Sequence, residues 1–209
     1  MKGSMKKLAV FVIVAAITMF ITATMASAKS PFPKAIRGQY AATSGSTCML
    51  APFGFNPNLT PINGVGIIQL INRWGVFTFE KDGTGSVTSN GSQITLSYMG
   101  PSGPVLPSAA SNTISWDFTY TVDDDGMITI TQVPETYFIT NISGPMNGAT
   151  YQVEGASLIG TITPDGKNIT LNGSASNLFT VIGPNLLPIG SNQSCSTSVV
   201  LIWQHNEKP

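Results

Sequence analysis

The sequence predicts an all-β protein: an antiparallel up-and-down barrel of about eight or nine strands, with a two-sheet β-sandwich as the alternative. Large apolar residues alternate with small polar residues in several segments, which is the side-chain period of a strand. Asp-Gly and Asn-Gly pairs separate these segments and favour tight hairpin turns. Only 10% of the residues are charged, which argues against long amphipathic helices. We favour the barrel because closure removes the exposed edges of a meander.

Residues 1–28 have the organisation of a secretory signal peptide. Three lysines precede an apolar run over residues 8–21, and Ala26-Ser27-Ala28 supplies a small-x-small cleavage site. The run is short for a membrane span, which is the alternative interpretation. We therefore expect cleavage after Ala28 and export of residues 29–209 as a single β-barrel domain, periplasmic or extracellular, with no stable membrane anchor. The two lysines directly before the apolar run are typical of bacterial signal peptides.

The strands are expected between the turn signals. An opening strand is predicted over residues 37–50 and a closing strand over 195–204. A strand at 150–154 is expected to continue into 157–163. The turns that we expect at Lys81-Asp82-Gly83-Thr84, Asn90-Gly91, Asp125-Gly126 and 164–167 join the remaining segments into hairpins, at residues 74–80, 85–89, 92–98, 113–122, 127–133, 157–163 and 168–172.

Three proline-containing segments resist assignment to strands: residues 51–65, 100–112 and 183–194. Each carries large apolar residues, such as Phe53, Leu106 and Leu187. Apolar residues in a long loop usually mean that the loop packs down as a lid or plug. The stretch 66–72 is ambiguous between a strand and a helical turn.

An aromatic stripe on the segment 113–122 raises the main functional question. Its large residues fall on one face of a strand. That face could look at a dry core, at lipid in an outer-membrane barrel, or at a bound ligand. In the ligand interpretation the binding residues are Trp116, Phe118 and Tyr120, together with Phe77, Phe79 and Tyr98 from the preceding hairpins.

The two cysteines, Cys48 and Cys195, are expected to form a disulfide, because both lie in the mature part of an exported chain. The bond would tie the first strand to the last. Two free thiols, or an intermolecular bond, are the alternatives. Each cysteine is in phase with bulky residues of its strand, as expected where a barrel closes.

The ionisable residues give few candidate sites. His205 is the only histidine and lies near the C-terminus, so no metal site and no cofactor are predicted. Asp123-Asp124-Asp125-Gly126 is interpreted as a solvated hairpin tip, because the glutamate that completes a calcium loop is missing. The mature chain is slightly acidic, so no nucleic-acid partner is expected.

Two further ionisable residues remain as weak candidates. Arg73 stands beside Trp74, and the pair is interpreted as a surface arginine over an aromatic ring, with an anion clamp as the alternative. Glu154 is the only catalytic candidate, and a weak one, because a carboxyl group inside an apolar barrel has a pKa in the range of a general acid.

The order of the strands, the Gly38-Gln39-Tyr40 triplet and a cysteine near the closing strand resemble the calycin group of up-and-down barrels, which includes lipocalins and avidins. Lipocalins usually carry a tryptophan where this chain has Tyr40. The resemblance implies a lipocalin-like barrel and covers most of the mature chain in pattern. Some barrels of this kind are isomerases or cyclases.

The expected function is non-covalent binding of a small hydrophobic molecule, because aromatic faces and apolar loops suit a covered barrel mouth. The alternatives are a calycin-like isomerase or cyclase that works without a histidine base, and a structural or adhesive surface protein. The sequence leaves the enzyme question open. It names no ligand and no oligomeric state.

Overall fold

A computed structural model describes residues 30–51, 53–64, 66–96, 98–100, 103–182 and 190–205, with backbone alone for 98–100, 103–105, 174–182 and 190–191. The chain forms two units, Met1–Pro31 and Phe32–Pro209, and the strands of the described residues belong to the second. The expected signal peptide and its cleavage site after Ala28 lie outside the described residues.

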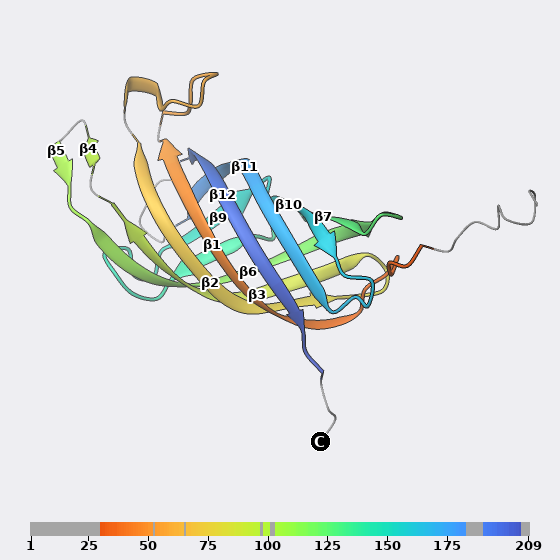
Figure 1. Ribbon diagram of the computed structural model, residues 1–209. Helices are drawn as coiled ribbons and strands as arrows, with labels where there is room; N and C mark the ends of the chain where they lie inside the picture. Colours follow the sequence, from red (N-terminus) through yellow and green to blue (C-terminus); the bar gives the residue numbers. More distant parts are fainter. Residues whose placement is uncertain are drawn as a thin grey trace, which may run out of the picture. The chain divides into compact units, whose positions relative to one another are not determined.

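The described part of the second unit is built from strands and one short 3-10 turn, η1 (Ile62–Gly64). The strands are β1 (Gly38–Ala51), β2 (Ile67–Phe79), β3 (Thr84–Thr95), β4 (Tyr98–Gly100), β5 (Gly103–Val105), β6 (Ser108–Val122), β7 (Met127–Gln132), β8 (Phe138–Asn141), β9 (Thr150–Glu154), β10 (Ser157–Ile162), β11 (Asn168–Ile182) and β12 (Gly190–Trp203). Figure 1 shows the long strands β2, β1, β12 and β11 side by side.

The main sheet closes on itself. β1 pairs with β2 on one side and with β12 on the other, so the first and last strands are neighbours. β7 and β8 pair with successive parts of β6, while β10 and β9 pair with successive parts of β11. Because β7 also pairs with β10 and β8 with β9, a circuit around the barrel crosses eight strands. The predicted antiparallel up-and-down barrel is confirmed.

Three local predictions are wrong. Asn90-Gly91 does not form a turn, because β3 runs through it and Gly91 pairs with Arg73 on one side and Asn112 on the other. The expected loop 100–112 contains β5 and the start of β6, whose small residues pair with β3. The expected loop 183–194 gives way to β12 at Gly190, and residues 183–189 lie outside the described chain.

Two other uncertain segments have clear outcomes. The stretch 66–72 is part of strand β2, not a helical turn. Residues 51–65 contain the expected non-strand segment, in which η1 and an isolated bridge between Phe55 and Pro61 are the regular features described. Phe53 and Leu59 in this segment are exposed, so these two side chains do not pack down as the lid that we expected.

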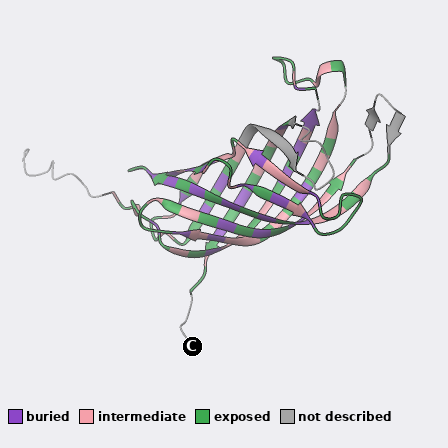
Figure 2. Cartoon of the chain, turned by 180° about the vertical axis from the view of Figure 1, so that it is seen from behind, coloured by how far each residue is buried: buried purple, intermediate pink, exposed green. Residues whose placement is uncertain are grey.

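The aromatic stripe of β6 faces the barrel interior. Buried and exposed residues alternate along the strands (Figure 2), and every second residue from Ile114 to Val122 is buried. The interpretation in which this stripe faces lipid is therefore wrong. Outward positions of β6 are polar, such as Thr119 and Thr121, which are exposed.

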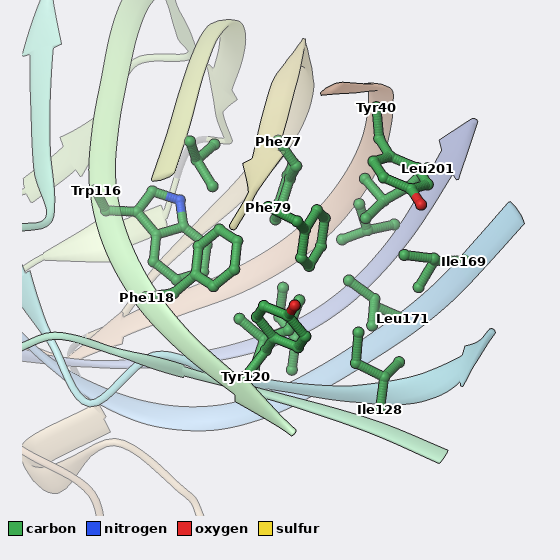
Figure 3. Packing of buried hydrophobic residues seen from close by; sticks show 14 of the residues in the cluster. Tyr40, Phe77, Phe79, Trp116, Phe118, Tyr120, Ile128, Ile169, Leu171 and Leu201 are labelled. Atoms are coloured by element: carbon green, nitrogen blue, oxygen red, sulfur yellow. The ribbon is translucent and has the colours of Figure 1, made fainter. Parts of the chain in front are cut away.

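One end of the barrel is densely packed. The rings of Phe79 and Phe118 are fully buried and meet edge to face, with centroids 5.1 Å apart. Aromatic side chains from β2 and β6 meet aliphatic side chains from β7, β11 and β12 (Figure 3). Gly85 makes room for this packing, because a Cβ there would lie 2.3 Å from the Phe118 ring. Interlocking of this density is what fills a small barrel.

The segment before β1 closes the packed end. Ile36 is buried and joins the core. Its backbone N–H donates to the Tyr120 hydroxyl at 2.8 Å, and that hydroxyl lies 2.8 Å from the Ile36 carbonyl oxygen and from that of Glu80. Phe32 packs against the same core and lies over Gly126. The plug that we expected from the long loops is therefore supplied here by residues 32–36.

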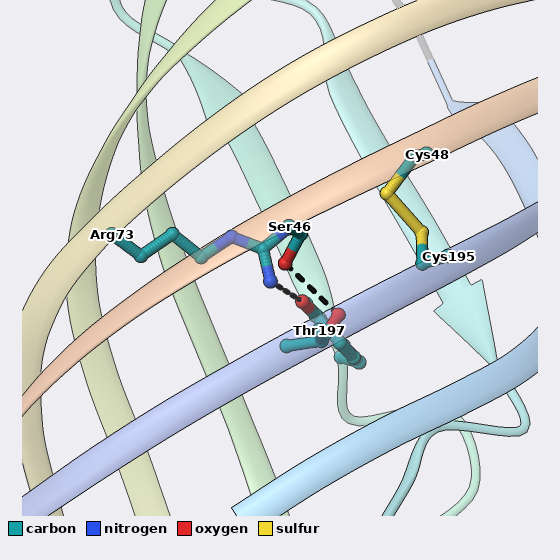
Figure 4. Close-up of a disulfide and its surroundings, with 6 residues drawn as sticks. Ser46, Cys48, Arg73, Cys195 and Thr197 are labelled. Carbon is teal, nitrogen blue, oxygen red and sulfur yellow. Dashed lines mark hydrogen bonds between the residues drawn. A yellow bond between two sulfur atoms is a disulfide. The ribbon is translucent and has the colours of Figure 1, made fainter.

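Cys48 and Cys195 form a disulfide that joins β1 to β12, as predicted (Figure 4). The two residues lie directly opposite each other in the register of the strands. A structural disulfide indicates an oxidising, non-cytoplasmic location. Within the described residues, no helix has the length and apolar character needed to span a bilayer.

Candidate functional site: an interior cavity

A cavity of about 80 Å³ lies inside the barrel, next to the packed core. One wall is apolar and contains Phe77, Trp116 and Tyr137 with several aliphatic side chains. The opposite wall comes from β1 and β12 and consists mostly of small or polar residues. The volume is several times the roughly 10–15 Å³ that one ordered water needs. We call this space the interior cavity.

The register explains why the barrel is hollow here. Ala42, Gly75 and Ser89 lie side by side across β1, β2 and β3, and all three line the interior cavity. Two residues along each strand, at the next inward position, the same strands carry Tyr40, Phe77 and Val87. Small inward side chains do not reach the barrel axis, so a space remains that the large ones would fill.

Arg73 extends from β2 into the interior (Figure 4). Its Nη1 donates a 2.7 Å hydrogen bond to the hydroxyl of Tyr137, and its Cζ lies 6.0 Å from the centroid of that ring. The Nε atom is buried and has no hydrogen-bond partner in the described structure. No aspartate or glutamate of the described chain lines the cavity. A guanidinium therefore brings positive charge into the barrel without a carboxylate beside it.

Tyr137 is placed by a break in the barrel wall. β7 ends at Gln132 and β8 begins at Phe138, and between them Glu135 has a positive φ of 63°. The Val133 N–H still donates to Asp117 of β6, which keeps the break attached to the sheet. The ring of Tyr137 turns inward and stacks on Trp116, with centroids 5.5 Å apart and planes 15° apart. The break thus supplies both an aromatic surface and the acceptor for Arg73.

The Gln132 side chain closes the same break. Its Nε2 donates to the Val153 carbonyl at 2.6 Å, and its Oε1 accepts from the Ala156 N–H at 2.9 Å. The backbone N–H of Gln132 also donates to the Ala156 carbonyl at 3.0 Å, so main-chain and side-chain bonds together join the end of β7 to the segment between β9 and β10. Gln132 is itself buried, so these bonds are protected from water.

Glu154, the weak catalytic candidate, belongs to this junction and does not line the interior cavity. Its Oε1 accepts hydrogen bonds from the backbone N–H of Glu135 at 2.8 Å and from Gln152 Nε2 at 2.9 Å. Its neighbour Val153 takes the inward position, and alternate residues of a strand face opposite sides. The Glu154 carboxylate thus accepts hydrogen bonds within the barrel wall and is not directed at the cavity.

The predicted ligand-binding residues divide into three groups. Phe77 and Trp116 line the interior cavity. Phe79, Phe118 and Tyr120 are inward but lie in the packed core. Tyr98 is the first residue of β4, and its side chain lies outside the described part of the structure.

The interpretation of Arg73 as a surface arginine over the Trp74 ring is wrong, and the two residues do not form an anion clamp together, because adjacent residues of a strand face opposite sides. Trp74 is 53% exposed, whereas Arg73 faces the interior and contacts Tyr137 instead. The sequence did hold a signal for this: Arg73 has the same parity as Phe77 and Phe79, so it was in phase with the inward face. Ser44 and Ser46 were likewise in phase with Tyr40 and Cys48.

The other charged groups lie away from the cavity. Asp123 Oδ1 accepts from the N–H groups of Asp125 and Met127, and Asp124 forms an ion pair with Lys34, as in a solvated hairpin tip. His205 is exposed, with its ring 5.1 Å from that of Trp203. No cluster of potential metal ligands occurs among the described residues.

Comparison with known proteins gives no assignment. No protein-family model matches the chain, and no curated protein matches its sequence.

Proposed function

We propose that this protein is exported and binds a small, largely apolar molecule non-covalently in the interior cavity, in the periplasm or outside the cell. The interior cavity itself is the observation that supports the proposal most. An eight-stranded barrel is narrow enough to be filled by its own side chains, and this chain does fill it at one end. Leaving a space beside Phe77, Trp116 and Tyr137 forgoes packing that the fold could have had.

The size of the cavity limits the ligand. Sites for drug-sized molecules usually have volumes of about 300–1,000 Å³, well above the volume of this cavity. The aromatic wall favours a flat or compact apolar body, since the stacked rings of Trp116 and Tyr137 present a broad surface. A long acyl chain does not fit such a space.

The first test fills the cavity. Ser89 is buried and lines it, so Ser89→Leu should occupy the space and abolish binding. Ser86 lies on the same strand and is exposed, so Ser86→Leu is the matched control and should bind normally. Molecules retained by the purified protein are identified by native mass spectrometry and then titrated into both variants. Equal binding by both variants, or no retained or added small molecule that binds, contradicts the proposal.

The isomerase or cyclase alternative needs an inward carboxylate. The described interior cavity has none, and Glu154 is occupied in the wall. No described feature favours an adhesive role. Binding is therefore the function that we carry forward.

A further inference from the structure

The interior charge points to the chemistry of the ligand, and this argument rests on the binding function proposed above. The chain has two arginines, Arg37 and Arg73. Arg37 is exposed, whereas Arg73 faces the interior cavity. Burying a charge is strongly unfavourable unless an opposite charge or hydrogen bonds compensate it. Arg73 is partly buried and its Nε is fully buried, so the cost of removing this guanidinium from water needs compensation.

The described protein compensates Arg73 only in part. A guanidinium has five N–H donors, and Tyr137 accepts from one of them. The Nε hydrogen has no acceptor among the described residues, and no described carboxylate pairs with this guanidinium. The Ser46 and Thr197 hydroxyls are bonded to each other at 2.9 Å, and neither accepts a hydrogen bond from Arg73 among the described contacts. A carboxylate accepts two parallel hydrogen bonds from one guanidinium, and such a pair would supply an opposite charge and acceptors for guanidinium N–H groups that Tyr137 does not bind.

A second unpartnered polar atom lies nearby but does not belong to the cavity. Asn112 is in register with Arg73 through Gly91, and its Oδ1 is buried without a partner. This oxygen lies over Gly91, where an added Cβ would be 2.4 Å from it, and Asn112 does not line the cavity. Within the described residues, Arg73 is therefore the cavity-lining residue with an unpartnered buried polar atom.

The rest of the cavity defines the other part of the ligand. Trp116 and Tyr137 form a stacked aromatic surface next to Arg73, and Phe77 meets Trp116 edge to face at 6.0 Å. Aliphatic side chains such as Ile114 and Leu158 complete the apolar wall. The volume excludes a long chain. We propose that the ligand is a small aromatic or branched-chain carboxylate whose carboxylate group is bound by Arg73 and whose apolar body lies against Trp116 and Tyr137.

The test compares acids with their neutral analogues. Benzoate, phenylacetate and 4-methylpentanoate are each titrated near neutral pH by calorimetry, beside benzamide, phenylacetamide and 4-methylpentanamide, which have nearly the same shape without the charge. The best-bound acid should bind the natural protein at least tenfold more tightly than its amide. Amides that bind as tightly as their acids overturn the inference.

Variants of Arg73 test whether its guanidinium is the group that binds the acid. Arg73→Gln should weaken acid binding at least tenfold and change amide binding less than twofold. Arg73→Lys keeps the charge but loses the paired geometry, so it should retain part of the preference for the acid. Arg37→Gln is the matched control and should bind like the natural protein. Acid binding that is unchanged in Arg73→Gln, or lost equally in Arg37→Gln, overturns the inference.

The outcomes separate the two proposals. Amides that bind without any preference for the acid leave the binding function standing and refute only the carboxylate. If none of the six compounds binds at millimolar concentration, and no retained molecule is found, both proposals fail. Because the acid–amide comparison uses the natural protein, it decides the question even if Arg73→Gln does not fold.

Discussion

The packed end of the barrel and the interior cavity are built by the same strands with opposite side-chain volumes. At the packed end, β2 and β6 present Phe79 and Phe118, which are fully buried. Around the cavity, β1, β2 and β3 present Ser44, Gly75 and Ser89. Backbone pairing is continuous through both regions. Inward side-chain volume, not the path of the backbone, therefore decides where this barrel is solid and where it is hollow.

The largest expected effect is at the packed end. Phe118→Ala should destabilise the fold by about 3–5 kcal/mol, because it removes a fully buried ring that contacts Phe79 and Tyr120. Urea unfolding followed by far-UV circular dichroism measures the loss. The exposed neighbour Thr119 provides a control, since Thr119→Ala should change stability by less than about 0.5 kcal/mol. A loss below 1 kcal/mol for Phe118→Ala would mean that this end is not tightly packed.

Gln132→Ala should be the next most costly change, at about 2–3 kcal/mol. It removes the two hydrogen bonds that its side chain makes to the backbone of Val153 and Ala156 across the break in the wall. Hydrogen exchange should show the Ala156 amide losing protection before the amides of β1. The exposed Thr131 supplies the control through Thr131→Ala. Unchanged protection of Ala156 would show that the Gln132 side chain does not hold the junction.

High pH should loosen the packed end. Burial raises the pKa of Tyr40 to about 12 from 10.0, with smaller contributions from the charges of Tyr120 and Asp165. The folded state holds this proton more tightly, so the stabilisation is complete below pH 10 and is lost as pH rises towards 12. We expect stability to fall by about 1–2 kcal/mol across that window, measured by urea unfolding. In Tyr40→Phe the fall should be smaller, and an equal fall would exclude Tyr40 as its source.

The smallest effect on stability should come from filling the cavity. Ser89→Leu should change stability by less than about 1 kcal/mol, because the added methyl groups enter empty space. Ile130→Phe makes a smaller enlargement at a fully buried position of the packed core and should nevertheless cost about 1–3 kcal/mol. The comparison is made by thermal unfolding of both variants. Equal costs would mean that Ser89 faces no usable space.

The sequence predicted the barrel fold but not which parts of the barrel interior are filled. Alternation in β6 and the Asp-Gly turn before Met127 predicted the hairpin of β6 and β7 correctly, because both signals are local. Asn90-Gly91 misled because the same pair suits a tight turn and a crowded strand. Gly91 is needed where Asn112 Oδ1 lies over β3, and only the neighbouring strands make that visible.

The candidate site was found in part for the same reason. Alternation of apolar and polar residues predicts that Phe77 and Trp116 face inward. The same alternation would also have predicted an inward position for Arg73. Tyr137 was not, since it follows the irregular stretch at Glu135, where the period of the strand is lost. Whether Phe79 lines a space or fills one depends on the size of the core residues that other strands contribute, and no local pattern contains that information.

The closure between β1 and β12 places Tyr40 opposite Trp203, so the two ends of the strand order are neighbours. The closed barrel therefore does not require the polypeptide chain to begin at β1. A circular permutant that joins the ends beside this pair through a short linker, and opens the chain at the Asp125-Gly126 hairpin tip, preserves every strand pairing. In such a molecule the strands could be synthesised in a new order and still form the same wall.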